Sequence, residues 1–139
     1  MEPVSVGQSL TGLGSFLLYF VSSLVFLVLF KWLYPLITPH KEWQLVREER
    51  NTAAAVAMAG AYVGFSIALG SAASHSVAYL DFVIWAVVAL LAQGVAYVIA
   101  NIVLSGVSQR IKNQELSAGV IAGGTSVAVG ILNAACMTY

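Results

Sequence analysis

Apolar residues fill four long runs without a single charge, and the charged residues are confined to the segments beside them. The runs are residues 3–30, 51–80, 82–109 and 116–139. Each run can hold the roughly 20 apolar residues that a helix needs to cross a hydrocarbon core about 30 Å thick. The pattern therefore predicts an all-α integral membrane protein, a four-helix bundle that forms one transmembrane domain over residues 1–139.

The four membrane helices are predicted at about residues 10–34, 52–74, 80–104 and 116–137. Pro35 is expected to end the first helix, because proline lacks an amide hydrogen and biases the preceding residue away from helix. The first run has no basic segment before it and no small-residue cleavage site after it, which favours a retained helix over a signal peptide.

The connections between these helices differ in character. Residues 41–50 are charged but include Trp43 and Leu45, so this segment is expected at the membrane surface with Trp43 at headgroup depth. A short turn around His75 joins the second and third helices, and a polar loop over residues 105–115 joins the third and fourth.

Basic residues predict the orientation. They occur only between the first and second uncharged runs and between the third and fourth: Lys31, Lys41, Arg47, Arg50, Arg110 and Lys112. Connections rich in Lys and Arg stay in the cytoplasm, so both loops are predicted there, and the two termini are predicted outside, in the periplasm of a Gram-negative cell. Only 9% of residues are charged and the net charge is zero, which excludes a soluble domain and argues against nucleic acid.

The two halves of the chain resemble each other at a shift of 64 residues. The shift aligns Ala54, Val56, Gly60, Val63 and Ile67 with Ala118, Val120, Gly124, Val127 and Ile131. A duplicated two-helix hairpin would enter the membrane twice in the same sense, as a parallel repeat. The composition is so rich in small residues that chance identity remains the alternative.

Glycines follow one face of the second helix, Gly60 and Gly64, and one face of the fourth, Gly119, Gly123 and Gly130. In lipid, such small-residue faces let helix backbones approach closely. The second and fourth helices are therefore expected at the centre and the first and third outside. The glycine faces have two interpretations, which are packing within the chain and an interface between copies in a homo-oligomer.

Polar residues inside the predicted spans are neutral. Gln93, Tyr97 and Asn101 lie four residues apart on the third helix, and Asn133 lies on the fourth. Hydrogen bonding between helices is one interpretation, and a narrow polar path is the other. The middle of each span lacks Asp, Glu, Lys and Arg, whereas proton relays and ion-coupled transporters usually need one.

The sequence contains no catalytic motif and no set of metal ligands, so we expect no enzymatic activity, no metal and no cofactor. Cys136 is the only cysteine, which excludes a disulfide within the chain. Near the end of the fourth helix it is expected to be a small buried side chain, although two copies meeting there would bring two thiols together.

Several segments resemble one bacterial family. They are Thr38-Pro39-His40, Glu42-Trp43-Gln44-Leu45, Asn51-Thr52-Ala53-Ala54, Asp81, Trp85, Gln93 and Asn133-Ala134-Ala135-Cys136-Met137-Thr138. The chain is similar, from about Thr38 to its end, to the YjfL-like inner-membrane proteins (domain of unknown function 350, UPF0719), while the first helix matches only as a hydrophobic span. The resemblance implies four spans built from two hairpins in a bacterial cytoplasmic membrane, and it implies no activity.

Three hypotheses of function are compatible with these features. The first is a non-enzymatic, self-associating scaffold or anchor, which presents Lys41, Trp43, Arg47 and Arg50 to a cytoplasmic protein partner or to membrane lipids. The alternative is a small oligomeric channel or transporter for an ion or small solute. A membrane anchor for a separate catalytic subunit is a third hypothesis.

Overall fold

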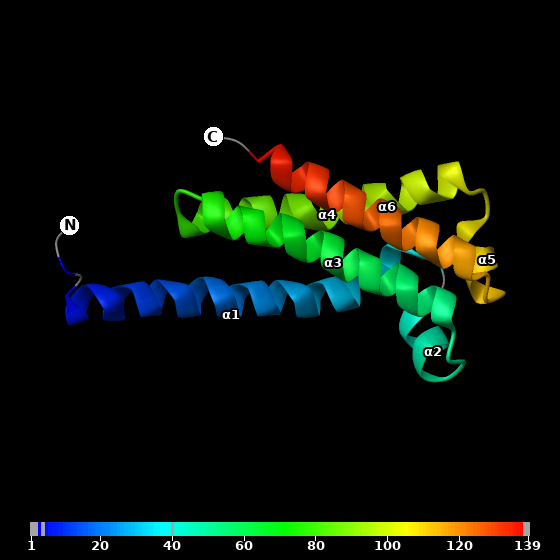
Figure 1. Cartoon of the computed structure of the whole chain (residues 1–139), viewed down its shortest axis with the longest axis horizontal. Coiled ribbons are helices and arrows are strands. Elements are labelled where there is room, and N and C mark those ends of the chain that lie inside the picture. Colours follow the sequence, from blue (N-terminus) through cyan, green and yellow to red (C-terminus); the bar gives the residue numbers. More distant parts are fainter. Residues whose placement is uncertain (1–2, 4, 40, 138–139) are drawn as a thin grey trace.

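The computed structural model describes residues 3, 5–39 and 41–137, and it is a bundle of four long helices with two short helices at one end (Figure 1). The helices are α1 (Val6–Ile37), α2 (Glu42–Arg47), α3 (Thr52–His75), α4 (Tyr79–Val103), α5 (Val107–Lys112) and α6 (Leu116–Ala135). The long helices α1, α3, α4 and α6 are each long and apolar enough to span a membrane. The predicted all-α membrane fold with four spans is confirmed.

Helix α1 continues past the residue that was expected to end it. It runs through Pro35 to Ile37, and the amide of Thr38 still donates to the carbonyl of Tyr34 at 3.1 Å. Pro35 removes only its own amide bond, so the last turn survives. Thr38 then adopts an extended conformation in front of Pro39, as residues before proline do. The prediction that Pro35 ends the helix was wrong, and the helix stops in front of Pro39 instead.

The other long helices lie close to their predicted positions, but the connections contain helices that were not predicted. The charged segment forms α2, which packs Leu45 into the bundle, and the loop before α6 forms α5, which buries Val107 and Ile111. Each short helix has six residues, too few for the apolar periodicity that identifies a helix in sequence. His40, in the family-like segment Thr38-Pro39-His40, lies outside the described residues.

Helices α3 and α6 form the closest pair and run parallel. Near their first turns, Ala53 lies against Gly119. Near their last turns, the hydroxyl of Ser71 donates to the carbonyl of Ala134 at 3.1 Å. Their central place agrees with the sequence-based expectation for the second and fourth helices.

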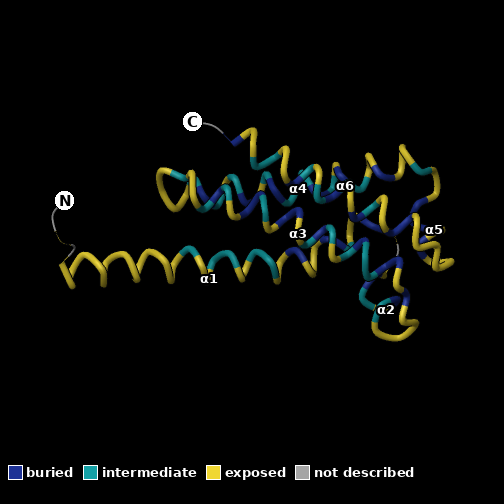
Figure 2. Tube along the Cα trace, in the orientation of Figure 1, coloured by how far each residue is buried: buried dark blue, intermediate teal, exposed yellow. Residues whose placement is uncertain are grey.

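Helix α4 was expected outside with α1, and the structure corrects this. It packs against both α3 and α6, and its buried face carries Ala86, Ala89 and Ala96. Alanine lets two helix backbones approach closely, which a bulky side chain prevents. Only α1 is peripheral, and its N-terminal part is exposed all round, as the yellow half of α1 in Figure 2 shows.

The six helices form two successive groups of the same order, α1–α2–α3 and α4–α5–α6. In each group the last long helix follows a residue with positive φ, Arg50 (52°) before α3 and Gln114 (61°) before α6. These two positions are 64 residues apart, the shift at which the sequence aligns with itself. The structure therefore supports a tandem repeat, with the short helix as an added element of each hairpin.

Candidate functional site

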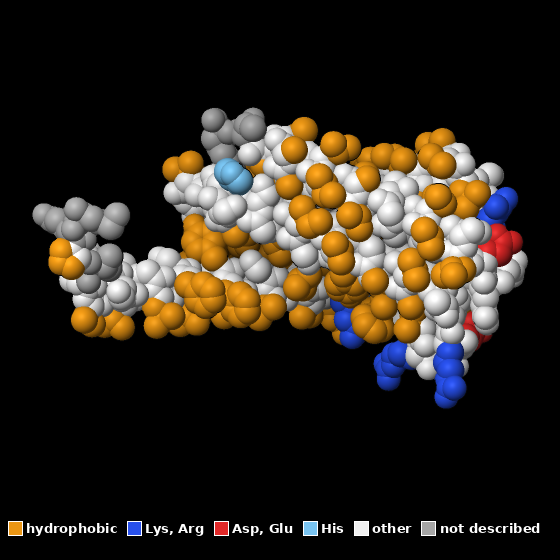
Figure 3. All heavy atoms as spheres, in the orientation of Figure 1, with side chains coloured by type: hydrophobic (Ala, Val, Ile, Leu, Met, Phe, Trp, Pro, Cys, Tyr) orange, Lys and Arg blue, Asp and Glu red, His pale blue; other side chains and the backbone are white. Residues whose placement is uncertain are grey.

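Basic side chains gather at the end of the bundle formed by α2 and α5, which we call the charged end (Figure 3). Exposed cations there come from both short helices and the turns beside them: Lys41, Arg47, Arg50, Arg110 and Lys112. Arg110 lies 3.9 Å from Glu115, and both side chains are about half exposed. Such surface pairs contribute roughly 0–1 kcal/mol to stability, so the contact with Glu115 leaves Arg110 available to bind a ligand.

One carboxylate at the charged end is buried. Glu42, the first residue of α2, is only 3% exposed, and the hydroxyls of Tyr34 and Tyr62 lie within electrostatic range of it. Burying a charge costs several kcal/mol unless the surroundings compensate it, so a buried carboxylate is a candidate functional group. The sequence pattern indicated its neighbours Lys41 and Trp43 but not Glu42. Its place within the family-like Glu42-Trp43-Gln44-Leu45 segment was the available signal.

Polar groups lead from Glu42 to the middle of the bundle. The Tyr34 hydroxyl interacts with the side chain of Ser126, and the carbonyl of Ser126 accepts a hydrogen bond of 3.2 Å from Nε2 of Gln93. Gln93 is fully buried, and its Oε1 has no hydrogen-bond partner among the described residues. The four residues connect the charged end with the layer where α3, α4 and α6 meet.

The residues proposed for a polar path lie in different surroundings. Gln93 is in the core, Tyr97 is half-buried and Asn101 is exposed. Eight residues rotate a helix by about 80°, which turns Asn101 away from the face that carries Gln93. Asn133 lies two turns beyond Ser126, and its buried Nδ2 lacks a hydrogen-bond partner within the described part of the chain. The structure does not bring Gln93, Asn101 and Asn133 together.

The five glycines selected for helix packing, Gly60, Gly64, Gly119, Gly123 and Gly130, all lie where α3 meets α6. A β-carbon on Gly64 would overlap the carbonyl of Ser126, and one on Gly130 would overlap the carbonyl of Gly64. The structure thus uses these glycines within the chain, as the first of the two interpretations expected. A surface for self-association must therefore be sought on other residues.

A groove of about 370 Å³ lies between α1 and α3, beside α2. Its lining is mostly apolar, and its residues are Leu27, Val28, Lys31, Trp43, Met58 and Tyr62. The Nζ of Lys31 is 5.0 Å from the ring centre of Trp43 and 5.5 Å from that of Trp32. An apolar groove with a cation at its rim matches the acyl chain and anionic headgroup of a phospholipid.

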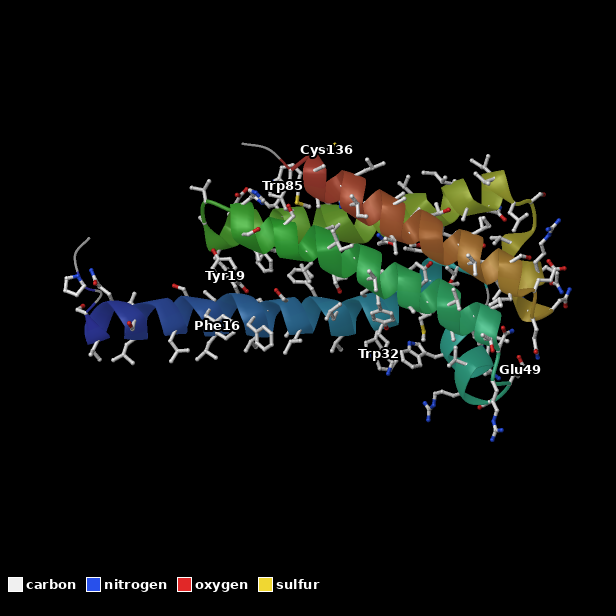
Figure 4. All side chains as sticks on the ribbon, in the orientation of Figure 1. Phe16, Tyr19, Trp32, Glu49, Trp85 and Cys136 are labelled. Carbon is white, nitrogen blue, oxygen red and sulfur yellow. The ribbon has the colours of Figure 1, made fainter. Side chains whose placement is uncertain are left out.

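Cys136 was expected to be buried, but it is exposed. Helix α6 ends at Ala135, short of the predicted residue 137, so Cys136 follows the helix at the end of the bundle remote from α2 (Figure 4).

The fold and the segregated charges define a small multi-pass membrane protein. The chain belongs to the family described as Domain of Unknown Function (DUF350), whose model matches residues 8–137. The resemblance found in the sequence is therefore confirmed, and it extends further than expected, because the match includes most of α1.

Two relatives carry the name UPF0719 inner membrane protein YjfL, from Escherichia coli strain K12 and from Escherichia coli O157:H7. Each is 37% identical to this chain over 130 residues, which cover 94% of the chain and 98% of the relative. No solved structure matches the chain. The name of the relatives and the four apolar helices together support a multi-pass protein of the inner membrane.

Proposed function

We propose that this protein is a non-enzymatic scaffold of the inner membrane, which self-associates in the bilayer and presents its charged end to a cytoplasmic partner. The observation that carries the proposal is the segregation of charge. All six Lys and Arg are exposed, and five of them lie on or beside α2 and α5. A surface of this kind fits an acidic protein segment or anionic lipid headgroups.

The orientation follows from the same charges. The positive-inside rule favours the charged end in the cytoplasm, and the start of α1 and the end of α6 lie at the opposite end of the bundle in Figure 1. Both termini would then face the periplasm. Trp43 and the Lys31 groove would lie at the cytoplasmic headgroup level, where aromatic rings and long cationic side chains are favoured.

The buried polar groups favour a scaffold over a conduit within one chain. They reach from Glu42 to Gln93, and the buried face of α4 beyond Gln93 carries Ala89, Ala86 and Phe82, while the buried amide of Asn133 on α6 stands apart from them. These side chains offer no hydrogen-bonding group to a moving ion or solute. The polar groups therefore serve to fix how the helices meet.

The test is a variant with Lys41→Gln, Arg47→Gln and Arg50→Gln. We expect normal insertion and loss of partner capture, measured by cross-linking in intact bacterial membranes and by flotation with anionic vesicles. Arg110→Gln with Lys112→Gln on α5 is the comparison, with a smaller loss because it removes two charges instead of three. Capture that is unchanged in the triple variant refutes the role of the charged end.

A channel formed by several copies is the second candidate. The observation that favours it is the pair of buried amide atoms without partners among the described residues, Oε1 of Gln93 and Nδ2 of Asn133. Water or an ion would satisfy both atoms. The test is solute flux through proteoliposomes. Flux that disappears on Gln93→Leu and on Asn133→Leu supports this function, and the absence of flux of common ions and polyamines opposes it.

A further inference from the structure

Lys31 is the one Lys or Arg of the chain that lies on a membrane-spanning helix, and it stands at the rim of the groove between α1 and α3. It comes six residues before the end of α1 at Ile37, which is about 9 Å along the helix axis. Among the described residues that line the groove, Lys31 alone carries a charge. The groove therefore combines a net positive charge with mostly apolar walls.

The groove has a polar end and an apolar end. Leu27 and Lys31 are one turn apart on α1, and Met58 and Tyr62 are one turn apart on α3. Helix α1 runs towards the charged end and α3 runs away from it (Figure 1), so Lys31 lies nearer the charged end and Leu27 lies one turn deeper in the bundle. Trp43 of the short helix α2 also lines the groove. A phospholipid in the adjacent leaflet has the same order, with its headgroup outside and its acyl chains inside.

Contacts with the bundle hold the side chains of the polar end in place. The Nζ of Lys31 lies 5.0 Å from the ring centre of Trp43. The Tyr62 hydroxyl interacts with the side chain of Trp43, and their ring centres are 6.4 Å apart. The Tyr62 ring in turn packs edge-on against the buried Phe30, with ring centres 5.1 Å apart. A site whose side chains are already ordered loses less conformational freedom when a ligand binds.

We infer that this groove binds one anionic phospholipid of the bilayer, with the phosphate on Lys31 and one acyl chain between α1 and α3. Charge decides which lipid fits. Phosphatidylethanolamine carries its own cation beside the phosphate, whereas phosphatidylglycerol has a net negative charge that a single Lys can balance. The groove measures about 370 Å³, and Val28 on its wall is 56% exposed, so the surrounding lipid reaches it from the side.

A lipid in this groove contacts three helices at once, because the lining residues come from α1, α2 and α3. Helix α1 is the peripheral helix, and aromatic side chains such as Phe30 make its contacts with the bundle. The bound lipid therefore adds a link between α1 and α3 on their outer side. The site goes beyond the surface proposed for partner capture, because its cation is Lys31 and not Lys41, Arg47 or Arg50.

The test measures which lipid lies beside Trp43. Trp32→Phe with Trp85→Phe leaves Trp43 as the only tryptophan of the full chain. This protein is reconstituted into phosphatidylethanolamine bilayers that contain equal mole fractions of either phosphatidylglycerol or phosphatidylethanolamine with brominated acyl chains, which quench a neighbouring tryptophan. We expect brominated phosphatidylglycerol to occupy the site about five times as readily, the factor that one cation near an anionic lipid contributes.

Substitutions in the same background separate the cation from the groove. Lys31→Gln should lower the occupancy ratio to about one, and Lys31→Arg should retain it because a guanidinium also binds phosphate. Arg110→Gln, which removes an exposed cation of α5 outside the groove, is the matched charge control and should retain the ratio. Met58→Phe narrows the groove without a change in charge and should lower the ratio. Val63→Phe, at an exposed position of α3 outside the groove, should not.

Three results would overturn the inference. The first is a ratio of about one in the protein that retains Lys31, and the second is a ratio that Lys31→Gln leaves unchanged. The third is an equal fall in Lys31→Gln and Arg110→Gln, which would assign the preference to the total charge of the protein. None of these results bears on the scaffold role, because the loss of partner capture in the triple variant of Lys41, Arg47 and Arg50 is measured with Lys31 intact.

Discussion

The two halves of the molecule share one plan but differ in their first helix. Helix α4 buries a face of alanines with Gln93 among them, and it packs against both α3 and α6. Helix α1 occupies the equivalent place in its own half, but it reaches the bundle with Tyr19, Phe26 and Phe30. Tyr34 is buried as well, whereas most of the other large side chains of α1 stay exposed, and Trp32 points away from the bundle in Figure 4.

The difference shows how side-chain size decides which helix becomes central in lipid. Burying an apolar residue against protein gains little there, because lipid tails are equally apolar. Contact energy then depends on how closely backbones approach, and alanine and glycine allow the closest approach. Helix α1 is held by a few aromatic contacts instead, so we expect it to separate from the bundle before the other helices do.

The largest predicted effect comes from breaking the central pair. Gly64→Leu places a side chain where the carbonyl of Ser126 lies, so α3 and α6 must move apart. We expect a loss of about 3 kcal/mol or more in the free energy of unfolding, measured by detergent titration. Gly14→Leu on α1, where a β-carbon meets no atom within 4 Å, is the control and should change stability by less than about 0.5 kcal/mol. Equal losses in both variants would mean that the glycines do not hold the pair together.

An intermediate effect is predicted for the attachment of α1. Phe30 is 2% exposed and stacks on Phe65 with ring centres 4.7 Å apart. Phe30→Ala should cost about 1–3 kcal/mol and increase hydrogen exchange in α1 while exchange in α3 and α6 stays unchanged. Phe16→Ala, in the same helix but 56% exposed, should leave exchange as it was. Faster exchange throughout the bundle would show that α1 is not a separate element.

The smallest effect is predicted for the buried amide of α4. Gln93→Leu removes one hydrogen bond but also an acceptor without a partner among the described residues, so stability should change by less than about 1 kcal/mol. Gln93→Glu buries a carboxyl group at the same place and should be clearly less stable at neutral pH. A Leu variant as unstable as the Glu variant would indicate that Gln93 binds water or an ion, which strengthens the channel alternative.

The membrane-spanning architecture could be read from the sequence because lipid permits few solutions. An uncharged run of 20 or more apolar residues must satisfy its backbone internally, and a helix does so. The role of the glycines of α3 and α6 could also be predicted, since a stripe of small residues in a membrane helix marks a face where another helix packs closely. Whether these glycines pack within the chain or between copies could not be predicted, because the sequence does not show which helix faces meet.

Other features depend on contacts that a single sequence does not display. Pro35 did not end α1 where the sequence predicted, because it lies in the last turn of the helix and removes only one hydrogen bond there. Glu42 is buried within electrostatic range of Tyr34 and Tyr62, which come from two other helices. Gln93 and Asn101 are both neutral polar residues within the same predicted span. The rotation of α4 places Gln93 in the core and Asn101 at the surface.

The central claim is that two equivalent units pack in parallel within one chain, and a disulfide measurement tests it most directly. Ser71 on α3 lies beside Ala134 on α6, so Ser71→Cys with Ala134→Cys in a Cys136→Ser background brings two thiols together. Oxidation in native membranes should give a disulfide within each monomer, and Ser71→Cys with Ser117→Cys, at the exposed start of α6, should give none. Preferential linkage of Ser71→Cys to Ser117→Cys, or linkage only between chains, would contradict the account.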